Sequence, residues 1–204
     1  MNKIESKEIA LKCNWSELKK SIVDSLCPRG EISEQNIGSF VDSWITIYDM
    51  NSGKENTDLK NIILRSLSSS CSGFNGQDEV LLKFDSLLQK LPFIKSEDLE
   101  RVTQRLLQHK GMQAFCSFGY LANIKVQSYK RLILKCSFTA MENYLDSNTV
   151  TAGLKRIAKE ALTIFKKNYE EVGESESFVE RLKLMKRRLR RKKPFLKYLN
   201  ENGW

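Results

Sequence analysis

The chain has little of what catalytic and metal sites commonly use. Its 204 residues include one histidine, three prolines and five cysteines. His109 has no second histidine within helical reach to form a zinc pair, and its place before Lys110 and Gly111 is typical of a helix C-terminus. Neither a Walker A sequence nor a G-x-G-x-x-G sequence is present, so the usual phosphate cradle of nucleotide-dependent enzymes is missing. We therefore expect no enzymatic activity, no cofactor and no metal site.

Two further absences bear on location. The N-terminal sequence MNKIESKEIALKCNW has scattered charges and lacks the apolar core of a secretory signal. No stretch approaches the ~18 consecutive apolar residues that a membrane-spanning helix needs. The five cysteines lie far apart without a C-x-x-C pair, which is typical of buried, reduced thiols. We expect an intracellular protein with no transmembrane segment, located in the nucleus.

Apolar residues recur at helical spacing almost throughout the chain, and strand-like alternation is absent over any useful length. The expected helices begin with a short one near residues 18–26, and a wide apolar stripe at 37–48 predicts a helix central to the core. The last helix of the body follows Thr149 or Thr151 and ends at Gly173. We therefore predict an all-α protein, a multi-helix bundle of about eight or nine helices with a basic amphipathic C-terminal helix.

Positive charge is concentrated near the C-terminus. Residues 181–197 contain ten Lys or Arg and no acidic residue, and the last 26 residues account for +8 of the net charge of +9. We therefore divide the chain into a helical body at 1–173, with a possible flexible loop at 68–77, and a basic arm at 174–204. The body has nearly equal numbers of basic and acidic residues, whereas the arm is strongly cationic. We therefore expect the arm to face a polyanion or an acidic partner.

The arm has the pattern of an amphipathic helix. Ser177 and Glu180 form a predicted capping box, and Pro194 is expected to end the helix and leave a short aromatic tail as far as Trp204. One face carries an apolar stripe that we expect to dock on the body or on a partner: Phe178, Leu182, Met185 and Leu189. The cations on the other faces are the predicted sites for nucleic acid or another polyanion: Arg181, Lys183, Lys186, Arg187, Arg188, Arg190, Arg191, Lys192 and Lys193.

Five interpretations of the arm remain open. Clustered Lys and Arg residues neutralise DNA or RNA phosphates, and they also fit the acidic groove of a nuclear import receptor. A basic amphipathic helix is similar to calmodulin targets and to helices that bind anionic membranes. The fifth interpretation is a solvated helix that covers the body through its apolar face and has no polyanion partner.

Two segments carry a resemblance to a known family. FDSLLQKLPFIKSEDLERVTQRLLQHK (84–110) resembles the helix–turn–helix core of the TFIIS N-terminal-like and LEDGF integrase-binding-like helical bundles. LKRIAKEALTIFKKNY (154–169) is similar to their closing helix, with Phe165 where a tryptophan is usual. The resemblance implies a compact bundle that binds short disordered motifs of transcription or chromatin factors.

Our leading interpretation is a non-enzymatic helical interaction module of a nuclear or nucleic-acid-associated protein. Its body would bind a partner protein, and its arm would contact phosphate or acidic surfaces. The alternative is an adaptor or inhibitor encoded by a pathogen or phage, which acts through its helical surface only and uses the arm for packing.

Overall fold

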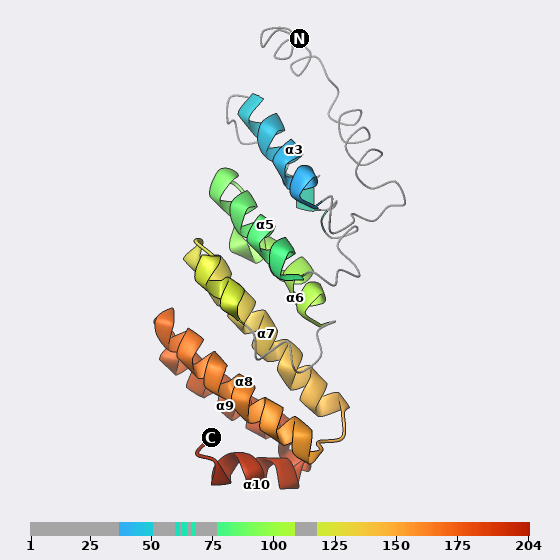
Figure 1. The fold of residues 1–204 in the computed structure, drawn as a ribbon, viewed down its shortest axis with the longest axis vertical. Helices are drawn as coiled ribbons and strands as arrows, with labels where there is room; N and C mark the ends of the chain where they lie inside the picture. Colours follow the sequence, from blue (N-terminus) through green and yellow to red (C-terminus); the bar gives the residue numbers. More distant parts are fainter. Residues whose placement is uncertain (1–36, 51–59, 62, 65–66, 68–76, 109–117) are drawn as a thin grey trace. The chain divides into compact units, whose positions relative to one another are not determined.

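The computed structural model describes residues 37–50, 60–61, 63–64, 67, 77–108 and 118–204. These residues form seven α-helices joined by turns and short 3₁₀ helices, and they contain no strand (Figure 1). The all-α class is confirmed. Eight or nine helices were expected for the whole chain; the predicted helix at 18–26 and nearly all of the predicted loop at 68–77 lie outside the described residues.

The chain divides into two compact units, Met1–Leu106 and Leu107–Trp204. This division differs from the expected boundary after residue 173, which falls inside the second unit. The reason is that the basic arm is packed onto the helices that precede it, as described below.

In the first unit, α3 (Ile37–Met50) packs against α5 (Gln77–Lys90). Phe40 and Trp44 are at most 1% exposed, and their rings meet edge to face with centroids 5.9 Å apart. The apolar residues of α3 recur every third or fourth position, so they share the helix face that α5 covers. The prediction that this helix belongs to the core is confirmed for the described residues.

The chain after α5 enters the next helix through a 3₁₀ turn. Pro92 follows the end of α5 by two residues, η1 spans Ser96–Leu99 and α6 spans Glu100–Gln108. The carboxylate of Asp98 accepts a hydrogen bond from the backbone N–H of Lys95 at 2.8 Å. It also pairs with the ammonium of Lys60 at 2.6 Å, which ties Lys60 to this turn.

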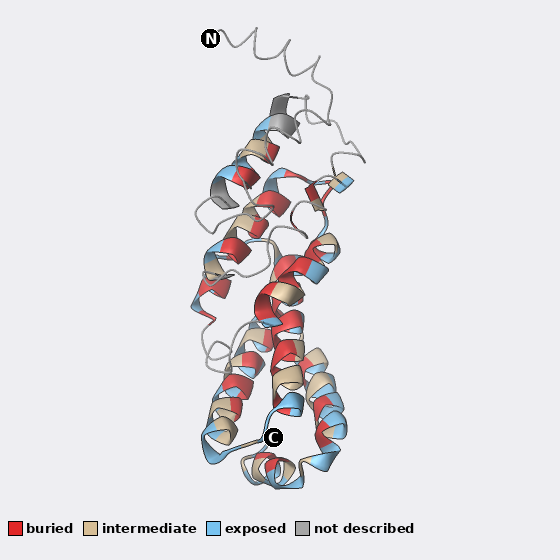
Figure 2. Ribbon diagram, turned by 90° about the vertical axis from the view of Figure 1, so that its right-hand side faces the viewer, coloured by how far each residue is buried: buried red, intermediate tan, exposed pale blue. Residues whose placement is uncertain are grey.

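The second unit is a three-helix bundle closed by a short fourth helix. After η3 (Gly119–Asn123) come α7 (Gln127–Ser147), α8 (Ala152–Glu171) and α9 (Ser175–Arg188), with α8 packed against both α7 and α9. The 3₁₀ turn η4 (Leu189–Arg191) leads into α10 (Lys193–Glu201), which packs on α8 (Figure 1). Buried and exposed residues alternate along these helices, as expected when each helix buries one face (Figure 2).

Two glycines make the turns that fold this unit. Gly173 has a φ of 73°, and Glu174 N–H bonds back to the Tyr169 carbonyl at 2.8 Å. This Schellman turn ends α8 where the sequence predicts it and allows α9 to return along α8. Gly203, with a φ of 80°, ends α10 in the same way, and Trp204 N–H bonds to the Leu199 carbonyl at 3.0 Å.

Candidate polyanion-binding surface

The predicted basic arm is folded as part of the second unit. Phe178, Met185 and Leu189 are 4%, 0% and 0% exposed, and Leu182 is half-buried. These residues share one face of α9 and its 3₁₀ extension. Because they are buried or half-buried, this face packs into the bundle, and the other faces of the helix meet solvent. The capping-box prediction is wrong, because α9 begins at Ser175 and therefore already includes Ser177.

Residues after Pro194 form a helix, which corrects the expected aromatic tail. Pro194 lies in the first turn of α10, where its missing N–H has no helical partner to lose and its fixed φ suits the helix. Phe195 and Leu199 are 1% and 0% exposed, so α10 contributes to the core. The break in the helix instead occurs before the proline, at Leu189–Lys192.

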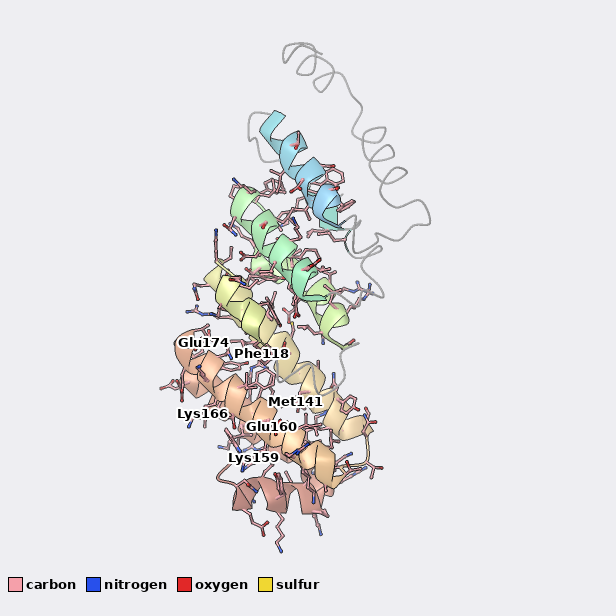
Figure 3. The ribbon with its side chains drawn as sticks, in the orientation of Figure 1. Phe118, Met141, Lys159, Glu160, Lys166 and Glu174 are labelled. Carbon is pink, nitrogen blue, oxygen red and sulfur yellow. The ribbon has the colours of Figure 1, made fainter. Side chains whose placement is uncertain are left out.

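An aromatic cluster anchors the arm to the bundle. The ring of Phe178 lies 6.2 Å from that of Phe138 on α7 and 5.8 Å from that of Tyr169 on α8. Phe165 continues the cluster, with centroids 5.3 Å from Phe138 and 5.0 Å from Phe118, which Figure 3 labels. Tilted and edge-to-face pairs at these distances stabilise a core beyond the effect of buried area. Thus α9 is held by side chains from both neighbouring helices.

Arg188 is engaged with α7 across the bundle. Its Nε lies 3.3 Å from Asp146 Oδ2, and its Nη1 lies 3.9 Å from Glu142 Oε2. Its guanidinium therefore faces the C-terminal half of α7. This cation links α9 to α7 through two carboxylates, although its side chain is 44% exposed.

Two of the predicted lysines also have partners inside the unit. Lys186 donates to Asn200 Oδ1 at 2.9 Å and to the backbone oxygen of Trp204, so it joins α9 to the end of α10. Lys192 donates to the Asn148 carbonyl at 2.6 Å, beyond the end of α7. From α8, Lys159 donates to Asn202 Oδ1 at 2.8 Å (Figure 3). These contacts fix α10 and the turn after it.

Arg181 lies near two groups whose ionisation the fold alters. Burial raises the pKa of Glu142 above its ordinary value of 4.5, and the positive charges of Arg188 and Arg181 oppose that rise. Burial also raises the pKa of Tyr169 to about 12, again opposed by Arg181. Arg181 is half-buried, and we assign it to the packing of α9 rather than to a solvent-facing site.

The other five predicted cations are exposed, and none of them forms an ion pair with a residue in the described part of the chain. We call them the free cations. They span the C-terminal half of α9, η4 and the start of α10. They are Lys183, Arg187, Arg190, Arg191 and Lys193.

A shallow pocket of about 430 Å³ lies on the exposed side of α9. Its lining combines apolar and basic side chains: Val179, Leu182, Lys183, Lys186 and Arg187. Val179 is 64% exposed, and it is one of two large aliphatic side chains of α9 that meet solvent. Our sequence reasoning missed Val179, although its spacing of four and seven from Lys183 and Lys186 places all three on one helical face.

The described residues contain no group of three or more His, Cys, Asp or Glu side chains arranged to hold a metal ion. His109 and four of the five cysteines lie outside those residues, while Cys136 is buried in α7. Across the same parts of the chain, no helix has both the length and the hydrophobicity of a membrane span.

Segments 84–110 and 154–169 resemble the TFIIS N-terminal-like and LEDGF integrase-binding-like bundles. Comparison with known proteins does not test this resemblance, so it stays a prediction. In the structure, 154–169 lies within α8, whose Phe165 is fully buried. The 84–110 segment includes the end of α5, η1 and α6, and its last two residues lie outside the described residues. No family model, curated protein or solved structure matches the chain.

Proposed function

We propose that the second unit binds the phosphate backbone of nucleic acid, without sequence preference, through the free cations. The observation that carries this proposal is their arrangement: five exposed, uncompensated positive charges lie within the 11 residues from Lys183 to Lys193 on folded helices. Because the aromatic cluster and Arg188 hold these helices, the charges are displayed on an ordered surface. Binding then requires less ordering of the backbone than a disordered tail would.

The expected affinity is electrostatic and depends on salt. Each phosphate that a cation neutralises releases condensed counterions, which gives a slope of log K against log salt of about −0.9 per contact on duplex DNA. If all five free cations make contacts, the slope is about −4.5. Arg181, Lys186, Arg188 and Lys192 are not counted, because their charged groups already contact residues of the same unit.

The test is a salt titration of binding to random-sequence DNA and RNA. The variant carries Arg187→Glu, Arg190→Glu and Arg191→Glu, and the matched control carries Lys90→Glu, Arg101→Glu and Lys167→Glu. All six residues are exposed, and both triple variants lower the net charge equally. We expect binding to be lost in the first and retained in the second. Equal loss in both would show an effect of net charge alone, and no binding by the natural chain at low salt would refute the proposal.

Truncation after Gly173 does not make a clean test. It removes Phe178, Met185 and Leu189, each at most 4% exposed, and leaves the partners of these residues on α7 and α8 uncovered. A truncated chain would lose stability whether or not the arm binds nucleic acid. The charge-reversal variant keeps every buried side chain.

In the wider function that we propose, the protein is a non-enzymatic interaction module of a nuclear or nucleic-acid-associated protein, and its helical body binds a partner protein. The free cations also suit the acidic groove of an import receptor. Nuclear location would be tested by imaging the tagged chain with and without the Arg187, Arg190 and Arg191 substitutions. An unchanged distribution would remove support for import through this surface.

A second candidate is an adaptor or inhibitor encoded by a pathogen or phage, which acts through its helical surface alone. The observation that favours it is that Lys186, Arg188 and Lys192 contact the bundle, as expected of an arm used for packing. This candidate expects no nucleic-acid binding at low salt, together with a protein partner whose affinity survives reversal of Arg187, Arg190 and Arg191.

A further inference from the structure

One face of α9 combines an apolar floor with a cationic rim. Val179 and Leu182 form the floor of the 430 Å³ pocket, and Lys183 and Arg187 stand beside it. Because Val179 is 64% exposed, the pocket presents apolar surface to water, and covering that surface would be favourable. The face is therefore suited to a ligand with both an apolar group and negative charge.

Lys186 lines the same pocket, but its ammonium already bonds to Asn200 and to the backbone oxygen of Trp204. Its aliphatic stem is left to form the wall next to Leu182. The charges available to a ligand are those of Lys183 and Arg187, which lie one helical turn apart. On the other side of Val179, exposed Glu176 would repel an anion. A negatively charged ligand should therefore lie toward the C-terminal end of α9.

We propose that this face binds an acidic peptide segment of a partner protein. One apolar side chain of the segment enters the pocket between Val179 and Leu182, and neighbouring carboxylates pair with Lys183 and Arg187. Charge complementarity supports a peptide of this kind, because it satisfies the floor and the rim together. A nucleic-acid backbone would use the cations but leave the floor uncovered. Among the described residues that line the pocket, there is also no aromatic side chain on which a base could stack.

The probes are three fluorescent peptides of about 15 residues, long enough to form a helix on binding. The first carries several glutamates around one leucine, the second replaces that leucine by alanine, and the third replaces the glutamates by glutamine. Anisotropy titrations with the full chain should show at least about tenfold weaker binding for the second and third peptides. Equal affinity for the first two peptides would show that the leucine does not enter the pocket. No binding of the first peptide at low salt would overturn the whole proposal.

A matched pair of variants locates the site. Val179→Asp and Leu184→Asp each add one negative charge at an exposed aliphatic residue of α9, but Leu184 does not line the pocket. We expect Val179→Asp to lower the affinity for the first peptide at least about tenfold. Leu184→Asp should change that affinity by less than about threefold. Equal effects of the two substitutions would place the peptide elsewhere.

The same pair separates this inference from nucleic-acid binding. Phosphate contacts depend on charge, so Val179→Asp and Leu184→Asp should affect random-sequence DNA and RNA equally. If Val179→Asp lost binding to single-stranded DNA or RNA and Leu184→Asp did not, a base would occupy the pocket. That result would overturn the peptide proposal. Loss of peptide binding in Val179→Asp without such a selective loss supports the peptide proposal, whether or not the natural chain binds DNA or RNA.

Discussion

The ring of Trp204 packs edge-on against that of Phe178, with centroids 6.1 Å apart and planes inclined at 73°. Trp204 reaches this position because the turn at Gly203 directs the chain back toward α9, where Lys186 also contacts the backbone oxygen of Trp204. The contact joins Trp204, three residues beyond the end of α10, to the first half of α9. The ring contact and the Lys186 hydrogen bond therefore hold the chain beyond α10 against α9.

The Phe178–Trp204 contact should be measurable in stability. Phe178→Ala leaves a cavity between α9 and the helices that it packs against, and it should lower the free energy of unfolding by about 3–5 kcal/mol. Trp204→Ala, at a half-buried position, should lower it by about 1–2 kcal/mol. In a double-mutant cycle by urea denaturation, we expect a coupling of about 0.5–1.5 kcal/mol. Strict additivity would show that the two rings do not stabilise each other.

Arg188 and Arg187 are adjacent, yet we expect them to behave differently. Arg188→Glu should lower the free energy of unfolding by about 1 kcal/mol, because it places a third carboxylate beside Asp146 and Glu142. Arg187→Glu should leave stability within about 0.5 kcal/mol and weaken nucleic-acid binding. Thermal or urea denaturation measures the first effect, and a binding titration measures the second. Rescue of Arg188→Glu by Asp146→Arg would confirm the pair.

Glu142 should make stability depend on pH. Because burial raises the pKa of this carboxyl above 4.5, the folded state holds its proton more tightly than the unfolded state. Stability contributed by the protonated form is present below pH 4.5 and is lost as pH rises through the folded pKa. Glu142→Gln cannot ionise, so its stability relative to the natural chain should increase across that range. Urea titrations at several pH values test this.

The control for Glu142→Gln is Glu180→Gln, which removes an exposed carboxylate from α9. This substitution gives the effect of removing one surface carboxylate from the same unit. A difference for Glu142→Gln that stays constant from acid to neutral pH would contradict the assigned cause.

Thr151 should cap α8, and Thr149 should not. Thr151 Oγ1 accepts a hydrogen bond from Leu154 N–H at 3.2 Å. Thr151→Ala should therefore lower the free energy of unfolding by about 1 kcal/mol, while Thr151→Ser should retain most of the cap. Thr149 is exposed ahead of the helix, and Thr149→Ala is the matched control. Equal losses on replacing either threonine would show that the cap contributes little.

Local signals were sufficient for much of the fold. The apolar spacing of α3 identified a core helix, and Gly173 marked the end of α8, because both depend on residues within a few positions of each other. The sequence left Thr149 and Thr151 as equal choices for the cap of α8, and the hydrogen bond to Leu154 selected Thr151. Boundaries that depend on packing were predicted less well.

Pro194 shows why the remaining boundaries were missed. In the sequence it looked like the end of a helix, although a proline suits the first turn of a helix equally well. What distinguishes the two cases is the burial of Phe195 and Leu199 against the bundle, and a local pattern does not contain that packing. Packing similarly allowed α9 to start at Ser175, before the capping box suggested by Ser177 and Glu180.

The sequence by itself determined that the chain is helical and that its positive charge is concentrated near the C-terminus. Tertiary structure decided which cations still face solvent. Arg188 is paired with Asp146, 42 residues away, and Lys192 is bonded to Asn148, 44 residues away. Helical periodicity places a side chain on a face of its own helix, but long-range packing decides what that face meets. For this reason, Lys183 and Arg187 remain available on α9, while Lys186 and Arg188 hold the unit together.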